Sequence, residues 1–141
     1  MNHRPATRAD LDLLARWNHE LIEDEQAQNP MSVPELKERM RAWLTRRQFA
    51  AVIFETAGEP VAYALYREHA GAIFLRHFFV RRGRRRARVG AQAMALLEQT
   101  VWADAERIVL EVLVHNTRGL SFWQSMGFHG RSLTMVKGDG P

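Results

Sequence analysis

The chain has no cysteine among its 141 residues. This absence excludes disulfides, thiolate metal ligands and a cysteine nucleophile, and it fits a reducing compartment. Long hydrophobic runs are also missing, because the longest, such as residues 49–54, are far too short to span a bilayer. Residues 1–10 carry charges and a proline but no apolar core, so no signal peptide is visible. We therefore expect a soluble cytoplasmic protein that folds as one domain, residues 1–141.

The charges are unevenly distributed. The net charge is +4, from 20 Lys and Arg against 16 Asp and Glu. Residues 81–88 contain six arginines, whereas Glu20, Glu23, Asp24 and Glu25 form an acidic run. The basic segment favours an anionic ligand, and the acidic run favours a cationic amine. The alternative is that both are solvated surfaces without a ligand.

The basic segment lies between two elements that give it a specific use. Two apolar runs, residues 73–75 and 78–80, precede it, and an amphipathic pattern begins at residue 89. The first N–H groups of a helix have no partner within the helix, and the helix dipole adds partial positive charge there. Arginines add forked donors that suit phosphate. The sequence thus predicts a phosphate-bearing ligand at residues 81–91. Nucleic-acid binding through the arginines is a weaker alternative, because no DNA- or RNA-binding module accompanies them.

Hydrophobic periodicity, capping signals and turn residues predict ten elements. The expected strands are residues 3–7, 49–56, 60–67, 72–80, 107–114 and 128–137, and the expected helices are residues 8–28, 32–46, 89–101 and 118–126. The order is β-α-α-β-β-β-α-β-α-β, which starts antiparallel and ends with a parallel β-α-β unit. The fold class is therefore α/β (α+β), a mixed central sheet with helices on both faces. Ligands of such sheets bind at the carboxyl ends of strands, where the basic segment lies.

Two motifs resemble those of the GNAT superfamily of N-acetyltransferases, and the element order resembles it over nearly the whole chain. The first motif, Arg/Gln-x-x-Gly-x-Gly/Ala, corresponds to residues 85–90, where Arg85 and Gly90 match and Arg88 replaces the middle glycine. The second motif, Asn-x-x-Ala-x-x-Phe/Leu-Tyr-x-x-x-Gly-Phe, corresponds to residues 116–128.

The second motif matches at Asn116, Phe122, Gly127 and Phe128. It departs at Gly119, where alanine is usual, and at Trp123, which replaces a tyrosine. The resemblance implies that acetyl-CoA is the cofactor, with its pyrophosphate on the backbone N–H groups of residues 86–91 and its pantetheine arm along residues 78–80. The cofactor-binding residues that the resemblance implies are Phe78, Phe79, Val80, Arg85, Arg86, Ala87, Arg88, Val89, Gly90, Ala91, Asn116 and Phe122. Asn116 is equally suited to capping the last helix.

Acetyl transfer to an amine requires a proton acceptor, a donor to the developing oxyanion and a proton source for the leaving thiolate. A backbone N–H at Phe79 or Val80 would serve the oxyanion. His77, Glu23 and Glu25 are the candidate proton acceptors, and ordinary surface or hydrogen-bonded roles are the alternative for each. Trp123 stands where the family often has its tyrosine acid, and an indole N–H has no proton to release.

The resemblance therefore implies an acetyl-CoA-dependent N-acetyltransferase that acts on a primary amine of a small molecule, protein or peptide. A non-catalytic acyl-CoA-binding or sensor protein is the alternative that the departures at Arg88 and Trp123 raise. The family also suggests a homodimer as a further partner, while no metal site and no membrane partner are expected.

Overall fold

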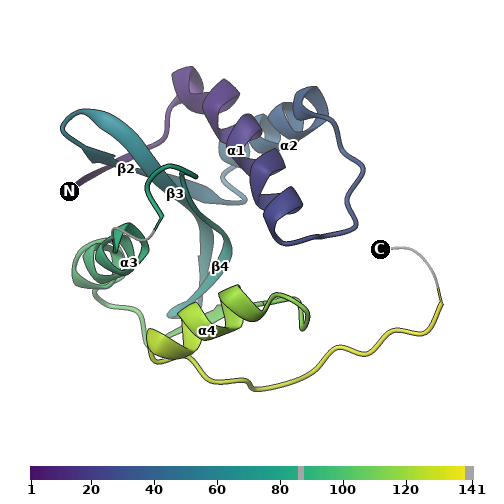
Figure 1. Ribbon diagram of the computed structural model, residues 1–141. Coiled ribbons are helices and arrows are strands. Elements are labelled where there is room, and N and C mark those ends of the chain that lie inside the picture. The colour runs from purple at the N-terminus through teal and green to yellow at the C-terminus, as the bar shows by residue number, and fades with distance from the viewer. Residues whose placement is uncertain (86–87, 139–141) are drawn as a thin grey trace.

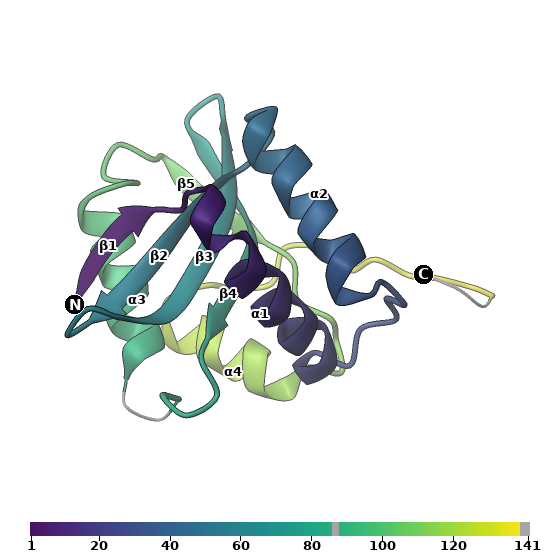
Figure 2. The same cartoon turned by 90° about the horizontal axis from the view of Figure 1, so that it is seen from above.

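The computed structural model describes residues 1–85 and 88–138 as three layers, with a five-stranded sheet between two pairs of helices (Figure 1). The elements are β1 (Asn2–Pro5), the 3₁₀ turn η1 (Arg8–Asp10), α1 (Leu11–Asp24), α2 (Val33–Thr45), β2 (Ala50–Thr56), β3 (Glu59–His69), β4 (Ala72–Val80), α3 (Val89–Gln99), β5 (Arg107–Leu110) and α4 (Thr117–Ser125). Helices α1 and α2 cover one face of the sheet, and α3 and α4 cover the other (Figure 2). The predicted fold class is confirmed.

Capping side chains fix the starts of the first two helices. Ser32 and Glu35 form the expected capping box at α2: the Glu35 N–H donates to Ser32 Oγ at 3.3 Å, and the Ser32 N–H donates to Glu35 Oε1 at 3.0 Å. Before α1, the Thr7 N–H donates to Asp10 Oδ2 at 2.7 Å. The guanidinium of Arg4 also donates to both oxygens of Asp10, at 2.8 and 2.9 Å, so β1 and α1 are joined at this carboxylate.

The strands are ordered β1-β2-β3-β4-β5. The first four strands pair antiparallel, whereas β4 and β5 pair parallel, as the β-α-β pattern predicts. Alternation along the strands sends Tyr63 and Phe79 to the α1–α2 face and Ala62 and Phe78 to the α3–α4 face. Each face has its own hydrophobic core, so the sheet holds β4 rigidly between two packed layers.

The prediction of a final strand at residues 128–137 was wrong. This segment is not paired to the sheet, and it projects from the body (Figure 2). Its apolar side chains are exposed, at 63% for Leu133, 85% for Met135 and 77% for Val136. A strand needs a backbone partner and a face to bury. The available edge is β5, which ends at Leu110 instead of residue 114 and so offers a ladder of only four residues.

Candidate active site

An open strand edge lies at the centre of the molecule. The ladder between β4 and β5 ends at the pair Leu75 and Leu110, whereas β4 continues to Val80. Along residues 76–80 the edge that faces away from β3 therefore has no ladder partner among the described residues. An open edge of this kind can bind an extended ligand through main-chain hydrogen bonds. It is the edge at which the pantetheine arm is expected.

The hydrogen-bond alternation shows which N–H groups face this opening. The Arg81 N–H donates to the Val61 carbonyl of β3 at 2.8 Å. Because main-chain groups alternate sides along a strand, the N–H of Val80 points toward the open edge and that of Phe79 toward β3. Arg85 Nε donates to the Val80 carbonyl at 2.8 Å, which agrees with this orientation. Of the two predicted oxyanion donors, the geometry therefore favours Val80.

Aromatic rings form one wall beside the open edge. Phe78 stacks on Phe122 with centroids 6.0 Å apart, and Trp123 packs edge-on against both rings, at 5.4 and 4.8 Å. Phe128 continues the wall, 5.2 Å from Trp123. Phe79 points to the other face, where it packs against Trp17. The structure therefore brings Phe78, Phe122 and Trp123 together, as members of the core between β4 and α4.

The start of α3 packs tightly on this wall. A Cβ atom on Gly90 would lie 3.2 Å from the Phe122 ring and 3.6 Å from Val80 Cγ2. Glycine is thus needed here so that the helix start can approach β4 and α4 closely. The N–H groups of Val89, Gly90 and Ala91 have no partner within the helix, because its first internal bond runs from the Gln92 N–H to the Arg88 carbonyl. These three groups can receive an anion.

Arg88 occupies the position of the missing signature glycine, with φ 60° and ψ 19°. This is the left-handed conformation that glycine adopts without strain. Arg88 therefore holds a conformation that a glycine at this position would adopt without strain, although the residue differs from the family pattern. The predicted contacts Arg86 and Ala87 lie outside the described residues.

The arginines of the basic segment meet the acidic end of α1. Arg82 pairs with Asp24 at 2.9 Å, Glu20 at 3.3 Å and Glu23 at 3.4 Å, and Arg85 pairs with Asp24 at 2.6 Å. We call the pairing of Arg82 and Arg85 with Asp24 the clasp. Burial would raise the pKa of Asp24, but the hydrogen bonds from Arg85 and Arg82 lower it overall. Part of the basic segment and part of the acidic run therefore neutralise each other in this structure.

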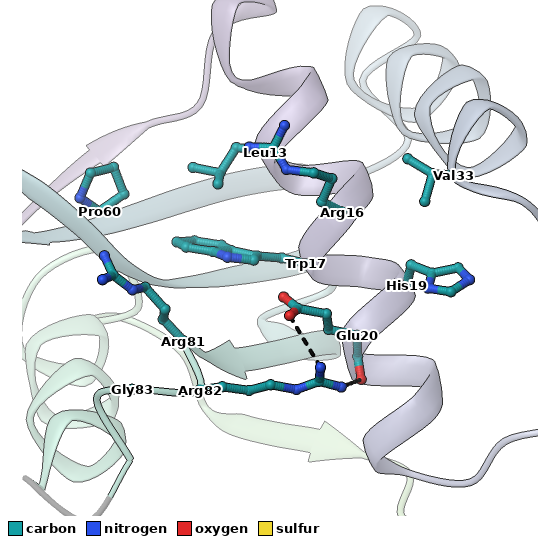
Figure 3. Close-up of a pocket in the computed structure, with 10 residues that line it drawn as sticks. All are labelled: Leu13, Arg16, Trp17, His19, Glu20, Val33, Pro60, Arg81, Arg82 and Gly83. Atoms are coloured by element: carbon teal, nitrogen blue, oxygen red, sulfur yellow. Dashed lines mark hydrogen bonds and ion pairs between the residues drawn. The ribbon is translucent and has the colours of Figure 1, made fainter.

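A cavity of about 660 Å³ lies beside the clasp (Figure 3). Its lining residues come from α1, the α2 start, the β3 start and the segment after β4, namely Leu13, Arg16, Trp17, His19, Glu20, Val33, Pro60, Arg81, Arg82 and Gly83. None of them belongs to the open edge at residues 76–80. The cavity flanks the site and does not contain the groups that acetyl transfer requires.

The candidate proton acceptors differ in their surroundings. His77 is 8% exposed, and its Nδ1 lies 3.1 Å from the Tyr63 hydroxyl. Burial, with the charges of Arg76 and Arg39, lowers the pKa of His77 to about 3, which makes it a weak base at neutral pH.

Glu25 is half-buried, and desolvation, followed by the charge of Asp24, raises its pKa above the ordinary value. Its carbonyl is within hydrogen-bonding distance of His115 Nε2, at 2.9 Å, which ties the end of α1 to the turn after β5. Glu23 is exposed and pairs with Arg82 and His19. Of the three, only Glu25 combines partial burial with a raised pKa, which are the properties of a general base.

Asn116, which the sequence indicated both as a cofactor contact and as a cap, does cap α4, because the Gly119 N–H donates to its Oδ1 at 3.0 Å.

Other residues near the site were not singled out from the sequence. Tyr63, Asn18, Arg39 and Arg76 form a polar group under α1 and α2, and no motif marks them. Tyr63 is brought to this group by the register of β3 against β4, which places it opposite Phe79 and which only the structure shows.

The family model described as the acetyltransferase (GNAT) family matches residues 15–128 of the 141 residues. The chain belongs to this family. The predicted resemblance is confirmed, and acetyl-CoA is the cofactor of the GNAT family. No curated protein matches the chain in sequence. Among the residues that the structure describes, no helix is long and apolar enough to cross a membrane.

Solved structures share the GNAT fold with this chain. A possible acetyltransferase from Clostridium difficile 630 is 17% identical with a TM-score of 0.79, and the match covers 99% of this chain and 97% of that one. The aminoglycoside N-acetyltransferase AAC(6')-Iy in complex with CoA is 15% identical with a TM-score of 0.75, covering 98% and 93%. The ribosomal-protein-alanine N-acetyltransferase from Brucella melitensis is 22% identical with a TM-score of 0.68, covering 92% and 85%. At these identities the likeness extends to the fold alone.

The residues of this GNAT family member fit acetyl-CoA on two counts. The helix start at Val89–Ala91 presents unpaired N–H groups to an anion, and the open edge of β4 presents main-chain groups to an extended amide chain. Val80 joins the two features: it is the last residue of the open edge, and its Cγ2 would lie 3.6 Å from a Cβ on Gly90 at the start of α3.

Proposed function

We propose that the chain is an acetyl-CoA-dependent N-acetyltransferase that acetylates a primary amine by direct attack in a ternary complex. The observation that carries this proposal is the open edge of β4, which leads into the free N–H groups of α3. The end of α1 that carries Glu25 is tied to the turn after β5, through the 2.9 Å contact of the Glu25 carbonyl with His115 Nε2. Bound acetyl-CoA supplies the acetyl thioester. The acceptor class within primary amines, whether of a small molecule, a protein or a peptide, is not fixed by these features.

The binding role falls to residues 78–80, 85–91, Asn116 and Phe122. The N–H groups of Val89, Gly90 and Ala91 hold the pyrophosphate, and Arg85 and Arg88 lie at the same loop to add charge. Phe122 reaches this site through its contact with Gly90. Asn116 acts by fixing the start of α4 and hence the position of Phe122.

The chemical role falls to fewer groups. Glu25 accepts the proton of the acceptor amine, because its raised pKa brings it nearer to the range of a general base. The Val80 N–H donates to the carbonyl oxygen that becomes negative. His77 holds the Tyr63 hydroxyl below the site. Trp123 donates at most a hydrogen bond, so water is the proton source for the leaving group.

The first test is titration calorimetry with acetyl-CoA, followed by thiol release over a panel of amines. We expect micromolar to millimolar binding and thiol release with at least one amine. Binding without thiol release from any amine would favour the acyl-CoA sensor. Absence of binding at millimolar acetyl-CoA would reject the proposal, and oligonucleotide binding that falls steeply with salt would then favour the nucleic-acid alternative.

The second test compares two carboxylates at the end of α1. We expect Glu25→Gln to lower kcat about 100-fold or more, because it removes the general base while keeping the shape. Glu23→Gln should change kcat much less, since Glu23 is exposed and ion-paired. Glu98→Gln, on the exposed side of α3, is the control for a surface charge. The opposite ranking of Glu23 and Glu25 would reassign the proton acceptor.

A further inference from the structure

Two arginines without counter-ions meet at one aromatic ring. The guanidinium carbon of Arg39, on α2, lies 4.4 Å from the centroid of Trp43, and that of Arg76, on β4, lies 4.7 Å from the same centroid. Among residues 1–85 and 88–138, neither arginine has a carboxylate within 4 Å, although Glu111 attracts Arg76 from farther away. Two positive charges are thus held together by an indole ring rather than by an acid.

The donors of this group are partly buried and unsatisfied. Arg39 Nε is buried without a partner, and so is Nδ2 of Asn18, a residue that is only 1% exposed. The one bond between them, from Arg39 Nη2 to Asn18 Oδ1, is long at 3.4 Å. Buried donors are ordinarily paired, and an unpaired donor on a cation is costly. Desolvation, with the charge of Arg76, accordingly lowers the pKa of Arg39. An anionic ligand would satisfy these groups.

The position of Arg76 ties this group to the reacting centre. In the pairing of β3 with β4, Leu65 faces His77 but Tyr66 faces Leu75, so Arg76 is the extra residue of a β-bulge. A bulge turns its side chain away from the regular alternation, and bulges are common beside active sites. Here the bulge turns the Arg76 side chain toward Trp43. Arg76 is also the first residue of the open edge of β4.

Most of the acidic run is not available to bind a cationic acceptor, contrary to the expectation from the sequence. Glu20, Glu23 and Asp24 are all paired with the arginines after β4, which leaves Glu25 as the one acid of the run outside these pairs among the described residues. Glu25 and Arg39 are both close enough to the Tyr63 hydroxyl for their charges to affect its pKa, and Arg76 shares Trp43 with Arg39, so one carboxylate and two guanidinium groups surround this region. This composition matches a ligand that carries both an amine and a carboxylate.

Given the N-acetyltransferase activity proposed above, we infer that the acceptor amine also carries a carboxylate, which Arg39 and Arg76 bind while the amine faces Glu25. The acceptor class is thus an amino acid or an amine of similar zwitterionic structure. Arg39 and Arg76 determine specificity and take no part in proton transfer. Guanidinium forks bind carboxylates through paired charge-assisted hydrogen bonds, which suits this role.

The inference is tested on the unmodified protein with matched acceptors. The common amino acids are assayed by thiol release, and the best acceptor is compared with its methyl ester and its decarboxylated amine. We expect the free carboxylate to raise kcat/KM about 10-fold or more over both analogues, mainly through KM. A preference for amines without a carboxylate would overturn the inference while leaving the N-acetyltransferase proposal intact. No acetyl-CoA binding and no thiol release at all would instead be the failure of that proposal.

Variants then locate the carboxylate site. Arg39→Gln and Arg76→Gln should each lower kcat/KM for the carboxylate-bearing acceptor about 10- to 100-fold, with the affinity for acetyl-CoA unchanged by calorimetry. Arg39→Lys keeps the positive charge, so it separates loss of carboxylate binding from loss of folding. Arg41→Gln, which breaks only the exposed pair with Glu38 on α2, is the control. Equal losses with the free acid and with its ester would refute the assignment of these two arginines.

Discussion

Lowering the pH from 7 to 5 is expected to destabilise the folded protein by about 2 kcal/mol through His77 alone. Burial first, and then the charges of Arg76 and Arg39, lower the pKa of this imidazole from 6.5 to about 3. The unfolded chain therefore binds a proton at a higher pH than the folded protein does. Stability is fully present above about pH 7, falls as the pH drops below about 6.5, and levels off only near the folded pKa.

The size of the effect follows from the same values. Each pH unit between the two pKa values is worth about 1.4 kcal/mol, and the loss between pH 7 and pH 5 stays near 2 kcal/mol for any folded pKa below about 4. The Tyr63 hydroxyl lies 3.1 Å from Nδ1, so the neutral imidazole shares a hydrogen bond with it inside the core. An imidazolium would place a net charge in this buried position, beside the charges of Arg76 and Arg39.

The measurement is urea unfolding at pH 7, 6 and 5 for the wild-type protein and for His77→Gln. Glutamine offers Tyr63 an acceptor but does not titrate, so the variant should lack the additional acid loss. Carboxylates with lowered pKa values, such as Asp10, also weaken in acid, but equally in both proteins. Parallel curves for the two proteins over this range would refute a buried, uncharged His77.

Three further changes test the surroundings of the site. Arg88→Gly should raise the free energy of unfolding by about 0.5–1 kcal/mol, because it relieves the left-handed conformation at φ 60°, whereas Arg88→Ala should not; equal midpoints in urea would contradict this. Gly119→Ala places a Cβ 2.4 Å from Asn116 Nδ2, so the side chain of the cap must move. The gain in helix propensity of about 1 kcal/mol should therefore appear only in an Asn116→Ala background, and a double-mutant cycle measures this coupling. Asp24→Asn opens the clasp, and calorimetry at low salt should then show acetyl-CoA binding up to about fivefold tighter; weaker binding would mean that the clasp shapes the phosphate loop.

Local patterns in the sequence were sufficient for most of the fold. The capping box at Ser32 and Glu35, the buried stripe Val89, Ala93 and Leu97, and the parallel β-α-β unit all formed as expected. These features depend on neighbours within a few turns of the chain or on the handedness of one crossover, so periodicity and propensity decide them.

The remaining features depend on contacts between distant segments. The strand predicted at residues 128–137 has suitable residues but no edge to pair with, because β5 ends at Leu110. The clasp joins residues about 60 positions apart, and the bulge at Arg76 appears only in the register of β4 against β3. Among the candidate bases, sequence could not separate His77 from Glu25, because the difference depends on burial. Burial raises the pKa of Glu25 and lowers that of His77. The homodimer stays a prediction.

The central claim is that acetyl-CoA binds along the open edge of β4 and at the start of α3. Amide chemical shifts of the ¹⁵N-labelled protein during a titration with acetyl-CoA test it most directly. The account predicts that the largest saturable changes fall on residues 78–80 and 89–91. Saturation with these amides unmoved, and with the changes gathered around the cavity at Trp17 and Pro60 instead, would contradict it.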